Sequence, residues 1–366
     1  MGFTCGIVGL PNVGKSTLFN ALTATAAADA ANYPFCTIGP NVGRVAVPDQ
    51  RLAVCARLAK SAEIVPTQLE FVDIAGLVRG AARGEGLGNQ FLSHIREVDA
   101  VAHVLRCFAD GNVTHVEGSV DPIRDAETVE TELMLADLES LERRAVHIVK
   151  RARGGDKEAR LLLAVVDPVL AALREGKPAR EAVIDPGRQG TLAALQLLTT
   201  KPVLYVANVD EGSAASGNAE SRRVAEYAAA RGARSVVISA AIEAELAQLA
   251  DAGEKGEFLA SLGLAETGLA RVIGAGYALL RLVTFFTAGP KEAHAWTVEQ
   301  GTKAPQAAGK IHTDFEKGFI RAETIAFADF AAYGGEQGAK DAGRMRLEGA
   351  DYVIQDGDVM RFRFNV

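Results

Sequence analysis

Aromatic residues and a strong excess of one charge are both lacking in this sequence. Aromatic residues make up 6% of the 366 residues, with a single tryptophan, so we expect a mainly aliphatic core. The net charge is −7, from 39 basic and 46 acidic residues, which excludes a protein that binds polyanions over its whole surface. Because 48% of the residues are hydrophobic, a largely disordered chain is also excluded.

Cysteine is scarce as well, and long apolar runs are absent. The four cysteines, Cys5, Cys36, Cys55 and Cys107, form no CxxC pair, which argues against a structural zinc site and favours buried thiols in a reducing compartment. No apolar run reaches the roughly 18 residues needed to span a bilayer, and no basic region precedes the first apolar stretch. We therefore expect a cytoplasmic protein without a membrane segment.

What is present divides the chain into three parts. In residues 1–120 and 200–278, apolar strand-like runs alternate with helical stretches, which predicts an α/β fold with a mostly parallel sheet. A helix is predicted for Lys15–Ala27. The predicted strands are Phe3–Leu10, Leu69–Asp73, Ala100–Cys107, Pro202–Asn208 and Arg234–Ser239.

Residues 121–199 have a different hydrophobic pattern. Apolar residues recur every three or four positions on both sides of Gly154-Gly155, which predicts two helices packed as an antiparallel hairpin. The turn, Lys150–Arg160, has five basic and two acidic residues, so contact with RNA is weighed against an ordinary solvated turn. The predicted seam consists of Met134, Leu138, Leu141, Ala145, Ile148, Ala159, Leu162, Val166, Val169 and Leu173.

Residues 281–364 are predicted to form a small α+β domain. The dipeptide Asp356-Gly357 favours a turn, so a β-hairpin is predicted within 352–366. After this turn, apolar and charged residues alternate, which predicts a strand with one apolar and one charged face. The apolar positions are Met360, Phe362, Phe364 and Val366, and the charged ones are Arg361 and Arg363.

The strongest motif is Gly9–Ser16, GLPNVGKS, which matches G-x-x-x-x-G-K-[ST] between a predicted strand and a predicted helix. In such a loop, backbone N–H groups and a helix amino terminus surround phosphate oxygens. Lys15 is placed to reach the β- and γ-phosphates, and Ser16 to bind Mg²⁺. The motif predicts nucleoside triphosphate binding, but by itself it does not separate a kinase, a transporter ATPase and a switch GTPase.

Two further positions favour the switch class. Asp73 ends a predicted strand and begins Asp-x-x-Gly, in which the carboxylate supports Mg²⁺ and the N–H of Gly76 can reach the γ-phosphate. The glycines that follow are typical of a loop that orders on a triphosphate and relaxes after hydrolysis. Thr37 lies on the loop before the second strand, where its hydroxyl can reach Mg²⁺.

The candidate base-binding motif is Asn208-Val209-Asp210-Glu211. Guanine-binding proteins have Asn-Lys-x-Asp, in which the aspartate accepts two hydrogen bonds from guanine. Here Val209 replaces the lysine and Glu211 replaces the aspartate, so we expect relaxed or lost preference for guanine. Ser239 and Ala240 follow the next predicted strand and suit the backbone-lined side of the base pocket.

Together these motifs resemble the translation-factor class of P-loop GTPases, and in particular the Obg-like ATPases of the YchF subfamily of the Obg family. The resemblance covers nearly the whole chain. It is carried by NVGKST, DIAGLV, GEGLGNQFL, NVDE in place of NKxD, and APQAAGKIHTDFEKGFIRAETIAF in the carboxyl-terminal part.

The resemblance implies a P-loop G domain (1–120 and 200–278), a helical coiled-coil insertion (121–199) and an α+β TGS domain with a ubiquitin-like fold (281–364). It also implies hydrolysis of ATP in preference to GTP with Mg²⁺, association with the ribosome, and a monomer. Carried over residue by residue, it assigns the base to the backbone near Val209, Mg²⁺ to Ser16 and Thr37, and the phosphates to Asn12, Val13, Gly14, Lys15, Ser16 and Thr17.

The group that orients the attacking water is not the glutamine found after Asp-x-x-Gly in many switch GTPases, because Leu77 stands there. His115, on a polar loop after the third predicted strand, is the candidate, because histidine can orient water or accept its proton near neutral pH. A surface histidine without a role is the alternative. Asn12 resembles the asparagine with which some related enzymes hold a potassium ion beside the phosphates.

Three functions are therefore considered. The favoured one is an ATP-hydrolysing switch whose output is binding to the ribosome or another protein. The first alternative is a nucleotide-gated adaptor for RNA or protein, in which hydrolysis is incidental. The second alternative is a conventional GTPase.

Overall fold

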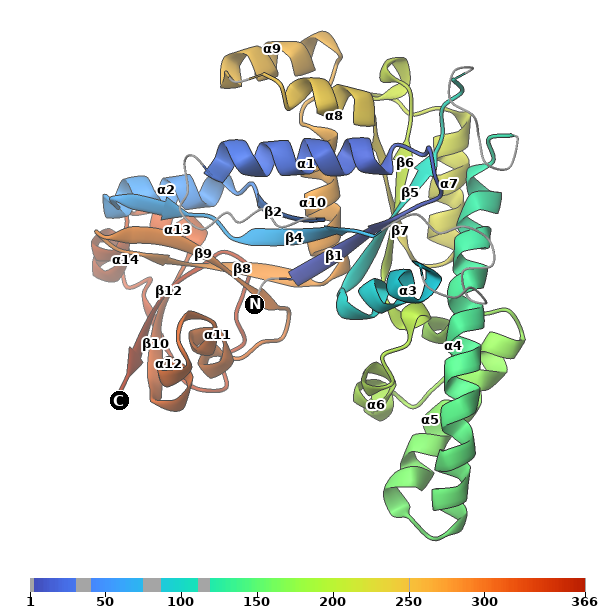
Figure 1. Cartoon of the computed structure of the whole chain (residues 1–366). Helices are drawn as coiled ribbons and strands as arrows, with labels where there is room; N and C mark the ends of the chain where they lie inside the picture. The colour runs from blue at the N-terminus through green and yellow to red at the C-terminus, as the bar shows by residue number, and fades with distance from the viewer. Residues whose placement is uncertain (1–2, 31–40, 75–86, 111–118, 250, 366) are drawn as a thin grey trace.

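Two β-sheets and a helical hairpin make up the molecule (Figure 1). The computed structural model describes residues 3–30, 41–74, 87–110, 119–249 and 251–365. The sheets lie next to each other, and the hairpin extends away from both. Among the described residues, no helix combines the length and the apolar character that a membrane crossing requires.

The first sheet has the strand order β2-β4-β1-β5-β6-β7. Its neighbouring strands are parallel, except that β2 is antiparallel to β4. Every residue of β5 is buried, as expected for a parallel strand covered on both faces. The strands are β1 (Phe3–Val8), β2 (Val42–Ala46), β4 (Gln68–Asp73), β5 (Ala100–Arg106), β6 (Val203–Asn208) and β7 (Arg234–Ile238).

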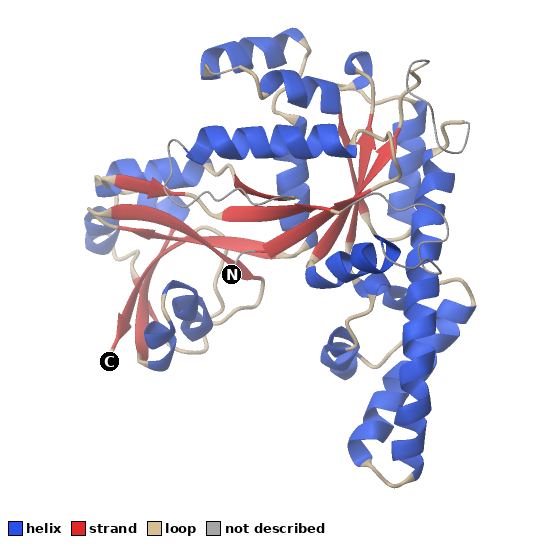
Figure 2. Ribbon diagram, in the orientation of Figure 1, coloured by secondary structure: helices blue, strands red, loops and turns tan. Residues whose placement is uncertain are grey.

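Helices cover both faces of this sheet (Figure 2). One face carries α1 (Lys15–Ala30), α8 (Ala240–Leu246) and α10 (Gly268–Leu279), and the neighbouring α9 is Ala252–Ser261. The other face carries α3 (Leu87–Glu97), α7 (Ala219–Ala230) and the first turns of α4. The carboxyl ends of the parallel strands, which point toward one edge, are where a doubly wound sheet binds its ligands.

The hairpin is built from α4 (Pro122–Arg153) and α5 (Lys157–Arg174). Asp121 caps α4 by accepting from the N–H of Ile123, and Gly155 takes a φ of 93° in the turn. Each residue of the predicted seam lies in the hairpin core or packs against it, so the predicted α-hairpin is confirmed. The spacing of apolar residues was enough to predict the hairpin, because an antiparallel helix pair is stabilised by contacts that recur along each helix.

A short segment returns from the hairpin to the first sheet through η1 (Ala179–Glu181), η2 (Pro186–Arg188), α6 (Gln189–Ala194) and η3 (Leu198–Thr200). Asp137 of α4 is fully buried and accepts hydrogen bonds from the N–H groups of Leu198 and Thr199, at 2.8 Å each, and from Thr199 Oγ1 at 2.7 Å. Burial raises the pKa of this carboxyl above its ordinary value. The contact fastens α4 to the segment that enters β6.

The second sheet has the order β11-β10-β12-β8-β9-β3 and mixes parallel and antiparallel pairs. One face packs on α11 (Ala304–Ile311) and α12 (Thr313–Lys317), and the other on α2 (Gln50–Ala59), α13 (Phe327–Ala332) and α14 (Glu336–Asp341). Its strands are β3 (Glu63–Val65), β8 (Leu282–Ala288), β9 (Glu292–Glu299), β10 (Phe319–Ala326), β11 (Arg346–Glu348) and β12 (Asp358–Phe364).

An amino-terminal segment completes this carboxyl-terminal sheet. The edge strand β3 pairs in parallel with β9, and Leu52, Cys55 and Ala56 of α2 belong to the same core as Phe286. No local pattern in the sequence indicated β3, because its three residues pair with a strand more than 200 positions away.

The predicted β-hairpin at 352–366 is wrong in its first arm. Val353 makes only an isolated bridge to Lys303, and β12 pairs instead with β10 and β8. The side chain of Asp356 explains the difference, because its Oδ1 accepts from the N–H of Thr284 at 2.9 Å and ties the turn to β8. The turn itself is present, with Gly357 at φ 90°, and the predicted burial of Met360 and Phe362 against exposed Arg361 and Arg363 is confirmed.

The cysteines within the described residues behave as expected. Cys5, Cys55 and Cys107 are free and buried, and burial raises the pKa of each thiol to about 12. Such thiols are protonated and unreactive at neutral pH. Cys36 lies outside the described residues.

Candidate nucleotide site

The glycine-rich loop leaves the central strand β1 at the carboxyl edge of the first sheet and leads into α1. Gly9 lies so close to β5 that an added Cβ would be 2.7 Å from the backbone oxygen of Val104. Asn12 and Gly14 have positive φ values of 63° and 93°, which turn the loop back toward the helix. Gly9 is therefore required by the close approach of the loop to β5, and Gly14 by the positive φ of the turn.

Gly14 also lies against the base motif. An added Cβ on Gly14 would be 2.2 Å from Nδ2 of Asn208, which donates to the backbone oxygen of Val13 at 2.9 Å. Oδ1 of Asn208 accepts from the N–H of Ala240 at 2.9 Å. One buried amide, 3% exposed, therefore connects the phosphate loop, β6 and the start of α8.

The first turn of α1 presents its polar groups to the same place. Lys15 is buried, with 9% exposure, and its side chain forms an ion pair with Asp73, the last residue of β4. The side chains of Ser16 and Thr17 are exposed, and the helix amino terminus contributes N–H groups and a partial positive charge. This arrangement suits a phosphate chain.

The residues near this turn fit a magnesium ion. The hydroxyl of Ser16 and the carboxylate of Asp73 are hard oxygen donors of the kind that Mg²⁺ prefers. Within the described ranges, no three His, Cys, Asp or Glu residues cluster as a metal cage.

The structure places the base motif at the end of β6. Val209 is buried, with 2% exposure, and its N–H donates to the backbone oxygen of Ile238 at 2.8 Å. Glu211 is exposed and begins η4 (Glu211–Ser213), which Asp210 caps by accepting from the N–H of Ser213 at 3.1 Å. The carboxylate of Glu211 therefore faces solvent.

Ser239 and Ala240 lie beside this motif, after β7. Both are buried, and Ala240 is the first residue of α8. Ser239 Oγ has no hydrogen-bond partner among the described residues. Two sequence-distant pairs, Asn208-Val209 and Ser239-Ala240, are thus brought together at one edge of the sheet.

Three predicted site residues, Thr37, Gly76 and His115, lie outside the described residues, as does Leu77. The roles of these residues remain predictions from the sequence.

One buried charge near the site was not singled out from the sequence. Arg106, the last residue of β5, is 1% exposed and pairs in register with Asn208. Its guanidinium donates to the backbone oxygens of Phe108 at 3.2 Å and Asp110 at 3.3 Å, and lies over the Phe108 ring. The signal in the sequence was an arginine at the end of a strand that is mostly apolar.

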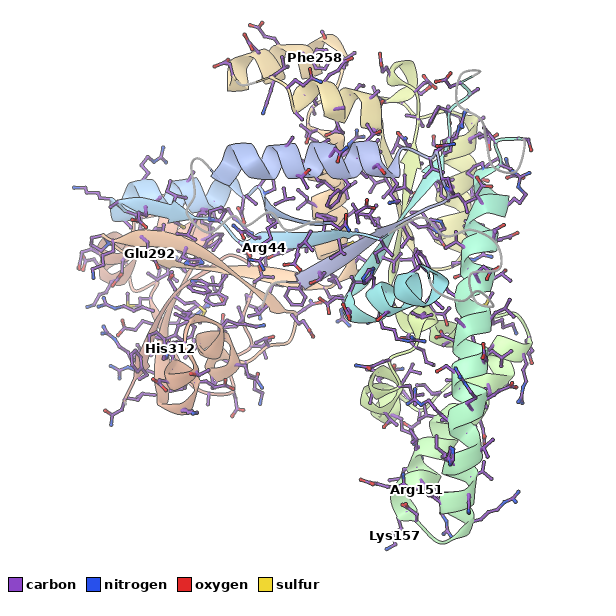
Figure 3. All side chains as sticks on the ribbon, viewed as in Figure 1. Arg44, Arg151, Lys157, Phe258, Glu292 and His312 are labelled. Atoms are coloured by element: carbon purple, nitrogen blue, oxygen red, sulfur yellow. The ribbon has the colours of Figure 1, made fainter. Side chains whose placement is uncertain are left out.

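The basic turn predicted between the helices is the free end of the hairpin. Figure 3 shows Arg151 and Lys157 there, far from both sheets. Arg151 pairs with Asp156 at 2.6 Å, and Arg160 donates to the backbone oxygen of Ala152 at 3.2 Å. Two of the five cations therefore have intramolecular partners.

Two family models match this chain. A model described as a 50S ribosome-binding GTPase matches residues 4–136. A carboxyl-terminal YchF-type GTPase model, described as a protein of unknown function, matches residues 282–365.

Curated relatives match along the whole chain. The chain is 57% identical over 366 residues to the ribosome-binding ATPase YchF of Haemophilus influenzae, and 54% identical over 368 residues to that of Bacillus subtilis. Both comparisons cover 100% of each chain.

Solved structures show the same architecture. The YchF GTPase of Schizosaccharomyces pombe is 36% identical, with a TM-score of 0.87 over 99% of this chain and 98% of that one. A GTP-binding protein from Pyrococcus horikoshii has a TM-score of 0.60 at 22% identity over 100% of both chains, a likeness of fold alone.

Proposed function

Since this chain belongs to the YchF family, a branch of the Obg-type P-loop GTPases, we propose that it is an ATPase that acts as a nucleotide-dependent switch on the ribosome. The observation that carries the proposal is the connection of the phosphate loop to the altered base motif through Asn208. More than half of the residues of the chain are identical, over its full length, to those of proteins named ribosome-binding ATPases. This identity supports ATP as the nucleotide and the ribosome as the partner.

We assign the phosphates to Asn12–Thr17, with Lys15 placed at the β- and γ-phosphates. Ser16 and Thr37 bind Mg²⁺, supported by Asp73, and the N–H of Gly76 meets the γ-phosphate. When bound, Mg²⁺ would neutralise charge that develops on the phosphate oxygens. The base lies between Asn208-Val209 and Ser239-Ala240, with Glu211 at the rim.

Calorimetric titration with MgATP tests the phosphate site. Lys15→Ala should abolish detectable binding, while Lys157→Ala at the exposed hairpin end should bind like the wild type. Undiminished binding by Lys15→Ala would remove the proposal. A second titration, in which ATP and GTP compete for the wild type, separates an ATPase from a conventional GTPase: we expect tighter binding of ATP.

Hydrolysis is assigned to His115 and a potassium ion. His115 orients the attacking water, and Asn12 helps hold the ion beside the phosphates. His115→Ala should lower kcat with nucleotide affinity unchanged, and turnover should be faster in KCl than in NaCl. Equal kcat for mutant and wild type removes the first assignment, and equal turnover in the two salts removes the second.

The proposed domain assignment follows the family resemblance. We assign 1–120 and 200–278 to the G domain, 121–199 to the coiled-coil insertion and 281–364 to a TGS domain with a ubiquitin-like fold, in a cytoplasmic monomer. Ribosomal RNA contact through the basic hairpin end would make ribosome binding fall steeply with ionic strength. Cosedimentation with ribosomes at increasing KCl measures this.

The second candidate is an adaptor gated by nucleotide, in which hydrolysis is incidental. The specific observation in its favour is Leu77 in place of the usual glutamine. Ribosome binding with a nonhydrolysable ATP analogue, compared with ATP and ADP, distinguishes the two. If the protein is an adaptor, a variant that cannot hydrolyse ATP should bind and leave the ribosome as the wild type does. If it is a switch, that variant should bind the ribosome with ATP but fail to dissociate from it.

A further inference from the structure

A groove runs along one side of the hairpin, between α4 and α5. It has a volume of about 660 Å³, and all of its lining residues come from these two helices. Its lining includes apolar side chains, among them Val146, which is 69% exposed. The lining residues are Glu142, Ala145, Val146, Val149, Lys150, Arg153, Asp167, Leu170 and Arg174.

The lining residues repeat with the spacing of a helix seam. On α4, Glu142, Val146, Val149 and Arg153 are separated by four, three and four positions. On α5 the spacing is three and then four positions, from Asp167 to Arg174. Two adjacent seams of this kind form a site for a third helix, because side chains at such spacing fit between those of a neighbour.

The opposite side of the hairpin shows how this protein fills such a space. Leu192, Leu195 and Leu197, in and after α6, belong to the hairpin core. Arg144 of α4 donates to the backbone oxygen of Leu195 at 2.8 Å. One side of the helix pair is therefore covered by a segment of the chain itself, whereas on the groove side the described residues that form the lining all belong to α4 and α5.

The charges around the groove specify the occupant. Glu142 and Arg174 pair with each other at 2.8 Å at the end nearer the sheets, so their charges cancel. Lys150, Arg153 and Asp167 make no ion pair with any described residue, so two cations toward the free end exceed the one unpaired carboxylate and the lining keeps a net positive charge. A helix that fits this groove has carboxylates at that end, beside an apolar stripe.

We propose that an amphipathic helix of a ribosomal protein, with carboxylates flanking its apolar stripe, docks in this groove as a third helix. The inference rests on the proposed ribosome binding and gives it a protein contact separate from the basic hairpin end. Eleven positions from Glu142 to Arg153 span roughly 16 Å, or three helical turns. A contact of this length suits one part of a larger, reversible footprint.

Two other occupants fit less well. RNA would place phosphates on Lys150 and Arg153, but the alanine, valine and leucine side chains of the lining contribute neither a cation for phosphates nor a ring for stacked bases. A second copy of this chain packed groove against groove would bring its own Lys150 and Arg153 with one unpaired carboxylate, Asp167, so cations would still outnumber carboxylates in the contact. Neither occupant supplies the excess of carboxylates that the groove needs.

The test measures binding to purified 70S ribosomes for Val146→Lys and Val146→Glu. The matched controls are Val183→Lys and Val183→Glu, since Val183 is a 91% exposed valine of the same insertion outside the groove. Both Val146 variants should bind at least about tenfold more weakly, the factor expected when a buried valine contact is lost. The Val183 variants should stay within about twofold of wild type, which is the usual scatter for surface changes.

Each other outcome overturns the inference in a recognisable way. Stronger binding by Val146→Lys with weaker binding by Val146→Glu would mean that RNA covers the groove. Wild-type binding by both Val146 variants would mean that nothing on the ribosome does. A wild-type dimer in sedimentation velocity that either Val146 variant dissociates would identify a second copy as the occupant. No binding by the wild type itself would remove the proposed function together with this inference.

Discussion

Gly14 and Asn208 are in such close contact that a Cβ on the glycine would lie 2.2 Å from Nδ2 of the asparagine. The two residues are 194 positions apart in the sequence, in the phosphate loop and the base motif. Because Asn208 also holds the backbone of Val13 and Ala240, this contact sets the distance between the two halves of the proposed nucleotide site.

Gly14→Ala should therefore abolish nucleotide binding by displacing Asn208. Gly155→Ala is the matched control, because both glycines have a φ of 93° but nothing lies within 4 Å of a Cβ on Gly155. Both variants carry a backbone cost of about 1 kcal/mol for a side chain at positive φ. Only Gly14→Ala should lose MgATP binding in a calorimetric titration, and equal affinities for the two variants would contradict this account.

Glu211→Asp should shift base preference toward guanine. Glu211 is exposed at the rim of the site, so shortening its side chain does not disturb packing and brings the motif closer to Asn-Lys-x-Asp. The measurement is the ratio of dissociation constants for GTP and ATP, which should fall. Glu245→Asp, an exposed position on α8, is the control and should leave the ratio unchanged. An unchanged ratio in Glu211→Asp would show that this carboxylate does not read the base.

His103 should make the fold sensitive to mild acid. Burial lowers the pKa of this histidine from 6.5 to about 4, and its Nε2 has no partner among the described residues. The folded state favours the neutral ring, so its contribution is fully present above pH 6.5 and is lost as the pH falls toward 4. In that window the wild type should lose up to about 1.4 kcal/mol of unfolding free energy per pH unit relative to His103→Phe.

Denaturant unfolding of both proteins between pH 7 and pH 4.5 measures this difference. The control is His147→Phe, which replaces an exposed histidine on α4 and should keep the wild-type pH profile. Parallel profiles for wild type and His103→Phe would mean that His103 titrates equally in the folded and unfolded chains.

Leu141→Ala should loosen the hairpin while sparing the nucleotide site. Leu141 is fully buried in the hairpin core, which is separate from the core around the phosphate loop. Its loss should cost about 2–5 kcal/mol of local stability. Hydrogen exchange should become faster in α4 and α5, with MgATP affinity unchanged. Leu161→Ala, at a 59% exposed position on α5, should show neither effect. A matching loss of MgATP affinity in Leu141→Ala would indicate that the hairpin and the site are one cooperative unit.

The place in the fold of several proposed nucleotide-site residues could be predicted from local sequence. The phosphate loop, Asp73, Asn208 and Ala240 were predicted to lie at or just after strand ends, and the carboxyl ends of a parallel sheet meet at one edge. The hydrogen bond between Asn208 and Ala240 appears only in the structure. Arg106 was overlooked. The pattern of a strand predicts which positions are buried, but it does not predict that a charged side chain at such a position will find hydrogen-bond partners.

The sequence by itself determined the elements whose stability comes from neighbours in the chain. The spacing of Leu141, Ile148, Val166 and the other seam residues specifies the hairpin, because helical contacts recur within each helix and across a short turn. Tertiary structure alone decided that β3 completes the carboxyl-terminal sheet and that Asp356 turns β12 away from a local hairpin. Those pairings depend on contacts between distant segments, whose free energy appears only when the whole chain is folded.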